Sequence, residues 1–450
     1  MKKQFFILLT AAGIAISTYS NAQEDFKPSG NLWGYVFGDY AVKSHNDTLS
    51  RGGGSVQYKG TNPLSSSNVV SGTNPAPANM QTDAFQIRRV YLGYDYRLTK
   101  NISAQIVLAN EQNVDAGGRN TTYVKFANVK YSNIFNLKNT DLVFGQYFTC
   151  SWAAPYGTEP LGGYRAVERT VMDMHAMDNA TDLGASLQGK AWTQKNVSDS
   201  LKPQFIGYYL QVGNNNGAVP NASNFKKVRM NLFFAALQQK LTVGLYGDYL
   251  VQQLSPYRTL NATMKIYAAY TTEKFRIGAE AFQQFNMNSD IYKIYVDGVQ
   301  PPGAANDTSY GLQLGWSVFA SVNIIKNKLN AFARMDRYNP DANYSSACVY
   351  TKAYSAIQNS GVAGALNPTT TFYTQTFYSA GLDWTPNARF HIIPNIWYNG
   401  YKTMMSTTGA NGTGSDLSAR TKSDYDLVYR LTFYFIFNSN KKVMNNGMYY

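Results

Sequence analysis

The stretch that most constrains the fold is the last long apolar run, residues 424–437, which reads DYDLVYRLTFYFIF. Every second residue from Tyr429 to Phe437 is large and apolar, whereas Arg430, Thr432 and Tyr434 alternate with them. A period of two is typical of a β-strand whose two faces meet different surroundings. The row of large apolar side chains on one face indicates that this face contacts lipid. Arg430 is then expected to point inward, because an arginine on the lipid side costs about 2–4 kcal/mol at the membrane midplane.

The beginning of the chain indicates export. The residues MKKQFFILLTAAGIAIST combine a basic start with an apolar run that is too short to cross a membrane. Ser20-Asn21-Ala22 then supplies the small-x-small pattern of a signal-peptidase site. We therefore predict a cleavable signal peptide at residues 1–22, a single barrel domain at residues 23–437 and a C-terminal tail at residues 438–450.

The composition excludes several classes of protein. Charged residues make up 15% and aromatic residues 14% of the chain, which is too little charge for a typical secreted globular enzyme. These values suit a transmembrane β-barrel with a polar inner face and aromatic rims. The formal charge of +13 is scattered rather than clustered, so we predict no nucleic-acid partner. Cys150 and Cys348 are too few for a disulfide scaffold or a zinc cage, and a single bridge between them stays open.

Sixteen segments have the length and pattern of β-strands. They cover residues 31–43, 85–98, 102–112, 123–133, 141–149, 182–192, 203–213, 228–239, 241–252, 260–272, 274–285, 309–325, 328–339, 372–384, 389–401 and 424–437. Short turns alternate with long segments rich in Gly, Ser, Asn and Pro, such as 44–80, 150–181, 286–308, 340–371 and 402–423. This alternation predicts an all-β fold: a transmembrane antiparallel up-and-down β-barrel with short periplasmic turns and long extracellular loops.

Two strands fix the direction of their side chains. In the strand from Leu260, Met264 and Ile266 share an apolar face, and Lys265 lies on the opposite, polar face. A register shift by one residue would place Lys265 in lipid, so its inward direction is strongly specified. The strand at residues 309–325 alternates in the same way. The fourth, fifth and seventh strands alternate poorly, and their faces are not assigned.

Several segments carry a resemblance to a known family. They are IRRVYLGYDY at 87–96, GGYRAVERT at 162–170 and TDLGASLQG at 181–189, together with the Gly-Tyr-aromatic pattern of the first strand. On these segments the chain resembles a bacterial outer-membrane porin and is similar to the phosphate-selective porin O/P-like family. The resemblance implies a water-filled, homotrimeric pore for small hydrophilic solutes. The lysine ladder and arginine clamp of phosphate-specific members cannot be matched residue by residue here.

Candidate catalytic residues are few. The chain has three histidines, His45, His175 and His391, and His391 lies in an alternating strand without a Ser or Asn at motif spacing. Neither a G-x-S-x-G elbow, an HExxH site nor a metal-spaced Cys/His cluster occurs. We therefore predict no enzymatic activity, no cofactor and no metal site. A non-conducting barrel that anchors a surface assembly stays open as an alternative to a channel.

The connection Cys150–Thr181 follows the fifth strand, where general porins carry the loop that narrows the lumen. Apolar residues at helical spacing from Leu161 to Met174 predict a short helix in it. We predict that its charged side chains line the pore constriction: Glu159, Arg165, Glu168, Arg169, Asp173 and Asp178. The acidic side chains outnumber the basic ones, so this loop is acidic although the whole chain is basic.

Strand parity directs basic side chains of the wall into the lumen: Arg89, Lys190, Arg229, Lys265, Arg276, Arg334, Arg389 and Arg430. Carboxylates offset them in part, namely Asp95, Asp248, Glu280, Asp336 and Asp383, and for any one of these residues simple solvation or pairing with another is an equally common role. An acidic loop opposite a basic wall predicts a transverse field that orients polar solutes. We therefore predict an outer-membrane diffusion pore for small hydrophilic or anionic solutes, with a mild anion preference. Outer-membrane lipid and lipopolysaccharide would surround it, and a phosphate-specific or anion-specific channel is the alternative.

Overall fold

The computed structural model describes residues 26–45, 47, 82–111, 121–151, 167–175, 177–194, 201–217, 225–254, 257–287, 291–295, 310–342, 348–352, 372–405 and 423–438. The predicted signal peptide and nearly all of the predicted C-terminal tail lie outside these ranges. Within them, sixteen strands form a closed barrel, and each of these strands pairs antiparallel with the barrel strands that precede and follow it in the chain. Two further short strands lie outside the barrel sheet. The predicted fold class and strand number are therefore confirmed.

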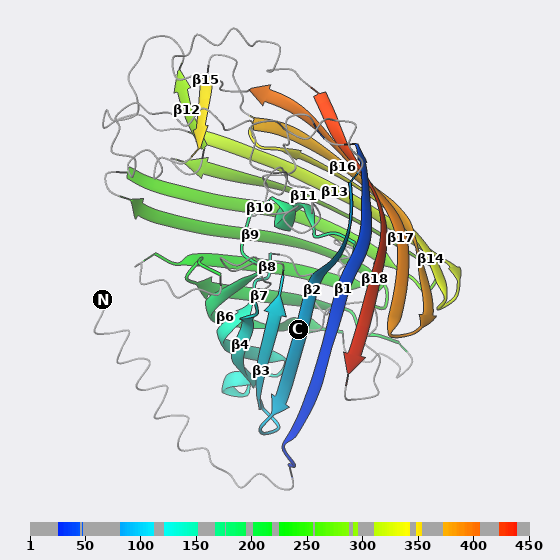
Figure 1. Ribbon diagram of the computed structural model, residues 1–450. Coiled ribbons are helices and arrows are strands. Elements are labelled where there is room, and N and C mark those ends of the chain that lie inside the picture. Colours follow the sequence, from blue (N-terminus) through cyan, green and yellow to red (C-terminus); the bar gives the residue numbers. More distant parts are fainter. Residues whose placement is uncertain are drawn as a thin grey trace.

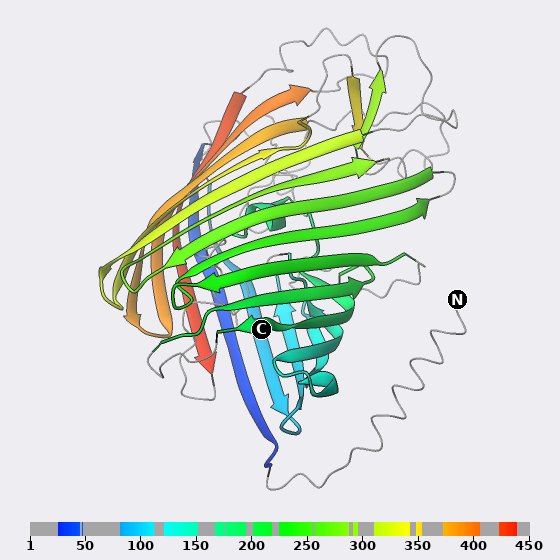
Figure 2. The same ribbon diagram turned by 180° about the vertical axis from the view of Figure 1, so that it is seen from behind.

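The barrel strands closely match the predicted segments. They are β1 (Ser29–His45), β2 (Thr82–Arg97), β3 (Ile102–Asn110), β4 (Tyr123–Ser132), β5 (Thr140–Phe148), β6 (Thr181–Thr193), β7 (Phe205–Gly213), β8 (Lys227–Ala236), β9 (Leu241–Leu254), β10 (Tyr257–Thr271), β11 (Phe275–Met287), β13 (Tyr310–Ile325), β14 (Leu329–Asn339), β16 (Phe372–Asn387), β17 (Phe390–Met405) and β18 (Ser423–Asn438). The last strand closes the barrel on the first, with Tyr35 opposite Ile436. Figures 1 and 2 show the two lying side by side, β1 in blue and β18 in red.

Two short strands were not predicted. β12 (Ile291–Tyr295) and β15 (Cys348–Lys352) lie in segments that the sequence assigned to long loops, and they pair with each other as a separate two-stranded sheet. Cys348 therefore belongs to a strand, and Cys150 is a free thiol buried in the barrel. Short helices complete the described part, η2 (Ile134–Asn136) and α2 (Val171–Met174). Neither has the length or the apolar character that crossing a membrane would require.

The two faces of the wall differ as the alternation predicts. On β18, Tyr429 and Leu431 are each 49% exposed on the outside, whereas Arg430 is 4% exposed on the inside. On β10, Met264 is 64% exposed and the adjacent Lys265 only 4%. The inward directions predicted for these two cations are therefore confirmed, and the outer face of the barrel is apolar.

Bulges explain why some strands alternate poorly in sequence. The pairing of β4 with β3 shifts at Lys125, so that Lys125 and Phe126 are both buried on the inside. In β5, Gly145 has a φ of +117°, a conformation that residues with a Cβ rarely adopt. A further shift in β2 places two consecutive cations, Arg88 and Arg89, in the interior. A bulge inserts one extra residue into a strand, so the side chains after it face the opposite side of the sheet from the one that strict alternation predicts.

An aromatic layer covers the inner face of β1. The rings of Trp33, Tyr35 and Phe37 stack in sequence, with centroids 5.9 and 5.3 Å apart. Tyr91 of β2 and Tyr434 of β18 pack against this row, each 4.6 Å from a ring in it. The three β1 rings are at most 3% exposed. This side of the lumen is therefore filled by aromatic side chains, which the expectation of a water-filled interior did not include.

Candidate functional site

One connection enters the barrel rather than leaving it. It joins β5 to β6 and spans residues 149–180, of which 149–151, 167–175 and 177–180 are described; we call it the inward loop. Its short helix, α2, lies between the front and back walls in both views (Figures 1 and 2). α2 contacts β13 and β14, on the far side of the barrel from β5 in the strand order. The loop therefore reaches across the lumen.

The loop is held first where it leaves β5. Asn231 Nδ2 donates to the Cys150 carbonyl at 2.9 Å, and the Cys150 amide donates to Gln211 Oε1 at 2.8 Å. Lys265 Nζ donates to the Ser151 carbonyl at 2.5 Å and also lies 3.3 Å from Glu280 Oε2. Side chains from β7, β8 and β10 thus satisfy buried backbone groups that have no strand partner.

Three arginines of the wall hold the middle of the loop by its backbone. Arg88 and Arg430 both donate to the Val167 carbonyl, at 2.8 and 3.2 Å, and Arg334 donates to the Glu168 carbonyl at 3.4 Å. We call Arg88, Arg334 and Arg430 the arginine anchor. These residues come from β2, β14 and β18, which lie three, eight and five strands from β5 in the closed order, so the loop is tied to parts of the wall well away from its origin.

Carboxylates and a tryptophan position the arginine anchor. Asp39 of β1 accepts from Arg88 Nε at 3.0 Å and is also paired with Arg430 Nη2. The guanidinium carbon of Arg430 lies 3.9 Å from the ring centroid of Trp397, and Asp336 binds Arg334 at 2.5 and 2.9 Å. Fully buried charges are stable only when paired and hydrogen-bonded, and each arginine of the anchor has a carboxylate partner, although Arg430 Nε has no hydrogen-bond partner among the described residues.

The far end of the described loop is held by its carboxylate. Asp178 binds Arg229 through two oxygens at 2.7 Å each, and Lys227 Nζ lies 3.0 Å from it. Tyr246 also donates to Asp178, at 3.2 Å. We call Asp178, Lys227 and Arg229 the aspartate anchor. Burial raises the pKa of Asp178, but the charges of Arg229 and Lys227 outweigh burial and hold that pKa well below its usual range.

Thr170 begins α2 as its N-cap, accepting from the Asp173 amide at 3.3 Å. Immediately after α2, His175 stacks on Tyr338 of β14, with centroids 3.5 Å apart and planes at 14°. Burial, and then the charge of Arg169, lower the pKa of His175 to about 3. His175 is therefore neutral at physiological pH, and its protonation would destabilise the buried stacking contact with Tyr338.

Of the predicted constriction residues, Glu159 and Arg165 lie outside the described residues. Glu168 is 2% exposed, and its Oε1 accepts from the Arg169 amide at 2.7 Å. Arg169 lies 3.6 Å from Asp173 Oδ1. Asp178 belongs to the aspartate anchor. The described charges of the loop are therefore bound to each other or directly to the wall, rather than facing basic side chains across a gap.

The predicted wall cations fall into two groups. Arg229, Lys265, Arg334 and Arg430 are buried and paired with carboxylates. Lys190 lies 4.5 Å from the ring centroid of Phe205, Arg276 lies partly buried on the inward face of β11, and Arg89 is 8% exposed. Arg389 precedes β17, in the turn from β16, and so lies at the end of the wall. Pairing with carboxylates, which the sequence left open, holds for the first group.

Sequence reasoning missed several residues that form this site. Arg88 escaped because the bulge in β2 breaks the parity that placed Arg89. Lys227 lies one residue before the predicted start of its strand, and Asp39 was not considered although the parity of β1 places it inside. Among the residues that the structure describes, His, Cys, Asp and Glu side chains form no group suited to a metal ion.

We expect His175→Phe to remove an acid-sensitive contact. The pKa of His175 is about 3 in the folded protein and 6.5 ordinarily, so between these values the unfolded chain binds more protons. Stability from this contact therefore falls as pH falls through that window, by at most about 1.4 kcal/mol per pH unit. Phenylalanine keeps a ring on Tyr338 and takes no proton.

The measurement is the melting temperature of both proteins in detergent from neutral pH to about pH 4, within the window of that titration. The variant should match the wild type at neutral pH and exceed it in acid. Asp178, whose pKa is also lowered, is the same in both proteins, so its contribution to the pH dependence cancels. If the melting temperatures of the two proteins changed in parallel over the whole pH range, His175 would not be the source of the acid sensitivity.

Comparison with known proteins gives a likeness of fold. No protein-family model and no curated protein matches the chain. The outer membrane channel DcaP of Acinetobacter baumannii is 9% identical, with a TM-score of 0.51 over 92% of this chain and 99% of that one. OprB of Pseudomonas putida, in a structure at high pH, is 10% identical, with a TM-score of 0.51 over 91% of this chain and 94% of that one. The chain therefore shares the closed barrel fold of DcaP and OprB.

Proposed function

We propose that the protein is an outer-membrane channel through which small hydrophilic solutes diffuse passively, with a mild preference for anions. The observation that carries this proposal is the inward loop, which wall side chains hold across the lumen at opposite sides of the barrel. Sixteen strands are about the number that leaves an aqueous channel rather than a filled interior. A peptide segment inside such a barrel reduces its cross-section and selects solutes by size and charge.

The arginine anchor supports the anion preference. Arg88, Arg334 and Arg430 lie together with Arg89, and the carboxylates nearby include Asp39, Asp336 and Glu168. Glu111 and Glu280 also interact with Arg89 and Arg334, but they are paired with Lys125 and Lys265. With these two pairs included, six cations face five carboxylates in this cluster. The Nη1 atom of Arg89 is buried and has no hydrogen-bond partner among the described residues. The same atom favours the second candidate, an anion-specific channel, because an unsatisfied buried donor suits an anionic ligand.

The location and assembly belong to the same proposal. The apolar outer face suits lipid, and the predicted signal peptide suits export to the outer membrane. The short turns would then face the periplasm and the long loops the exterior. A homotrimer is the assembly that the sequence resemblance implies, and chemical cross-linking of the protein in native membranes tests it.

The decisive measurement is the current through single molecules in planar bilayers, with the reversal potential in a salt gradient. We expect stable conductance and a reversal potential on the anion side. Strong cation selectivity would contradict the anion preference. Saturable block of the current by phosphate would support the anion-specific alternative, and the absence of current would support a non-conducting scaffold.

A further inference from the structure

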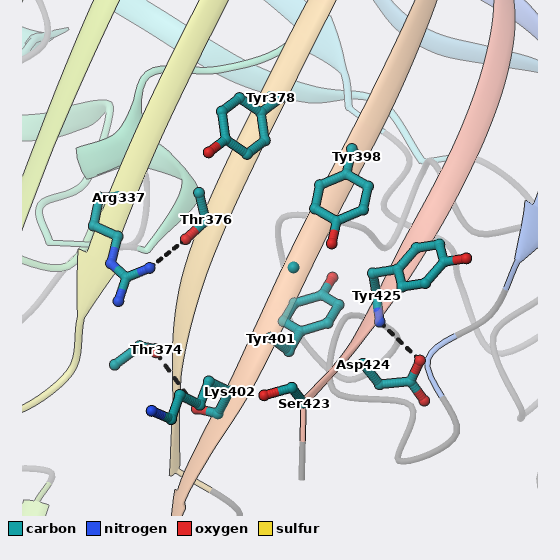
Figure 3. A pocket seen from close by; sticks show the side chains of 11 residues that line it. Arg337, Thr374, Thr376, Tyr378, Tyr398, Tyr401, Lys402, Ser423, Asp424 and Tyr425 are labelled. Carbon is teal, nitrogen blue, oxygen red and sulfur yellow. Dashed lines mark hydrogen bonds between the residues drawn. The ribbon is translucent and has the colours of Figure 1, made fainter. Parts of the chain in front are cut away.

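A groove lies on the outside of the barrel, apart from the lumen. It has a volume of about 370 Å³ and runs over β14, β16, β17 and β18 (Figure 3). It is near the barrel end that carries the long connections, since β16 begins at Phe372, β17 ends at Met405 and β18 begins at Ser423. If the protein lies in the outer membrane as proposed, this groove meets lipid near one membrane surface.

Strand register arranges the polar side chains of the groove in rows. Arg337 lies opposite Thr376, and Thr376 lies opposite Gly400 on the next strand. Arg337 Nη1 donates to Thr376 Oγ1 at 2.5 Å. One row nearer the barrel end, Thr374 lies opposite Lys402. Two cations and two hydroxyl groups thus gather around a position where glycine has no side chain.

Tyrosines form the side of the groove toward the membrane centre. Tyr378 lies opposite Tyr398, with ring centroids 5.9 Å apart, and Tyr398 stacks on Tyr425 at 5.1 Å. The next outward residues, Ile396 and Tyr429, lie opposite each other, are at least 36% exposed and continue the apolar outer face. The groove therefore changes from charged to aromatic to apolar along the barrel axis. Lipids change in the same order from headgroup to acyl chain.

The two cations are unusual for their position. Arg337 and Lys402 both alternate outward on the wall, where the neighbouring outward side chains are mostly apolar, and both are exposed. The carboxylate that lines the groove, Asp424, accepts from the Tyr425 amide at 2.9 Å and lies 3.8 Å from His45 Nε2. The outward side of the groove is therefore positively charged.

We infer that this groove binds the phosphate-bearing headgroup of an anionic outer-leaflet lipid. Arg337 and Lys402 hold the phosphate. The Thr376 hydroxyl, which accepts from Arg337, donates to a neighbouring headgroup oxygen, whereas the Thr374 hydroxyl donates to the Lys402 carbonyl. The acyl chains lie along the tyrosines and the apolar wall below. Cations at the level of lipid headgroups attract phosphates, and guanidinium binds phosphate oxygens in pairs. The inference rests on the proposed membrane location and not on conduction.

The test uses the full protein refolded in a neutral detergent and titrated with diphosphorylated lipid A, with bound lipid counted by native mass spectrometry. The double variant Arg337→Ala/Lys402→Ala should weaken binding by about 25-fold, or about fivefold for each cation. Gly400→Leu should also weaken binding, because a Cβ at Gly400 would already lie 3.1 Å from Tyr398 Cε1 and the rest of the side chain fills the hollow. The matched control is Lys274→Ala/Lys328→Ala, which removes two exposed cations from short turns at the opposite end.

Each outcome decides the inference. Binding that falls with the groove variants, stays with the control and is lost for dephosphorylated lipid A supports it. Equal binding by wild type and the double variant overturns it, as does displacement of the lipid by millimolar inorganic phosphate alone, which would make the groove a site for free phosphate. Cross-linking of two copies through Cys placed at Lys402 would make the groove a subunit interface instead. Single-channel currents of the same variants show separately whether the proposed channel function holds.

Discussion

Asp178→Asn is expected to release the inward loop and to increase the single-channel conductance. The substitution keeps the shape of the side chain but removes the charge that binds Arg229 and Lys227, all three of which are fully buried. Removing one partner of a buried ion pair costs about 3–5 kcal/mol, because the other charge stays buried. Asp182 and Asp248 remain close to Arg229 and Lys227, at 2.8 and 3.1 Å, so we expect a loss near the lower limit.

The strands do not depend on this contact, so the barrel should stay closed while the loop moves. We therefore expect a lower free energy of unfolding in detergent, together with larger and noisier currents. The control is Glu273→Gln, which breaks an exposed pair with Lys326 whose side chains are 89% and 74% exposed. Exposed pairs contribute little, so neither quantity should change. A destabilised Asp178→Asn protein with unchanged current would show that the loop lies outside the conduction path.

The sequence was sufficient to predict the barrel because a period of two is a local property. Each strand indicates which of its sides faces outward, as Met264 and Leu431 do, and a cation such as Lys265 or Arg430 excludes the alternative register. Sixteen such segments, with short and long connections in alternation, leave few other folds. The closing pair of β1 and β18 follows from the same reasoning, because a barrel leaves no strand edge unpaired.

The site could be predicted only in part, because its contacts join residues that are far apart in the chain. Parity places Arg430 in the lumen, but it does not indicate that Arg430 shares Asp39 with Arg88 and donates to Val167. Those contacts depend on the path of the loop and on a bulge in β2. Charge counting alone therefore suggested opposed acidic and basic surfaces, whereas the described charges of the loop are in direct contact with the wall or with each other.

Direct contact between the charges of the loop and the wall changes how ion selectivity should arise. If each described cation were neutralised by its own carboxylate, the wall would exert little net field on a passing ion. The Asp39 site is different, since one carboxylate serves both Arg88 and Arg430, and Arg89 is nearby. Removing a single charge there changes the net charge of the site by one unit in surroundings of low dielectric constant. Asp39 is therefore the position where a single substitution should have the largest effect on ion preference.

Asp39→Asn should make the channel more anion-selective, and Arg430→Met should shift it toward cations. A change of one unit charge about 8 Å from a passing ion changes its energy by roughly 2 kcal/mol at an effective dielectric constant of about 20, which changes the preference by roughly 30-fold. Arg430 is fully buried over Trp397, and methionine replaces the apolar stem of the side chain, so the second variant loses mainly charge. The two reversal potentials should move in opposite directions from that of the wild type.

Salt separates this field effect from a change in pore shape. The screening length is about 10 Å at 0.1 M salt and about 3 Å at 1 M, so both shifts should shrink strongly at high salt. A shift caused by altered pore dimensions would persist. Asp83→Asn serves as the control, because Asp83 is exposed on the outward face of β2 and the same substitution there leaves the lumen unchanged. If Asp39→Asn and Asp83→Asn give the same reversal potential while both proteins stay folded, ions do not pass the arginine anchor, and selectivity is set elsewhere in the barrel.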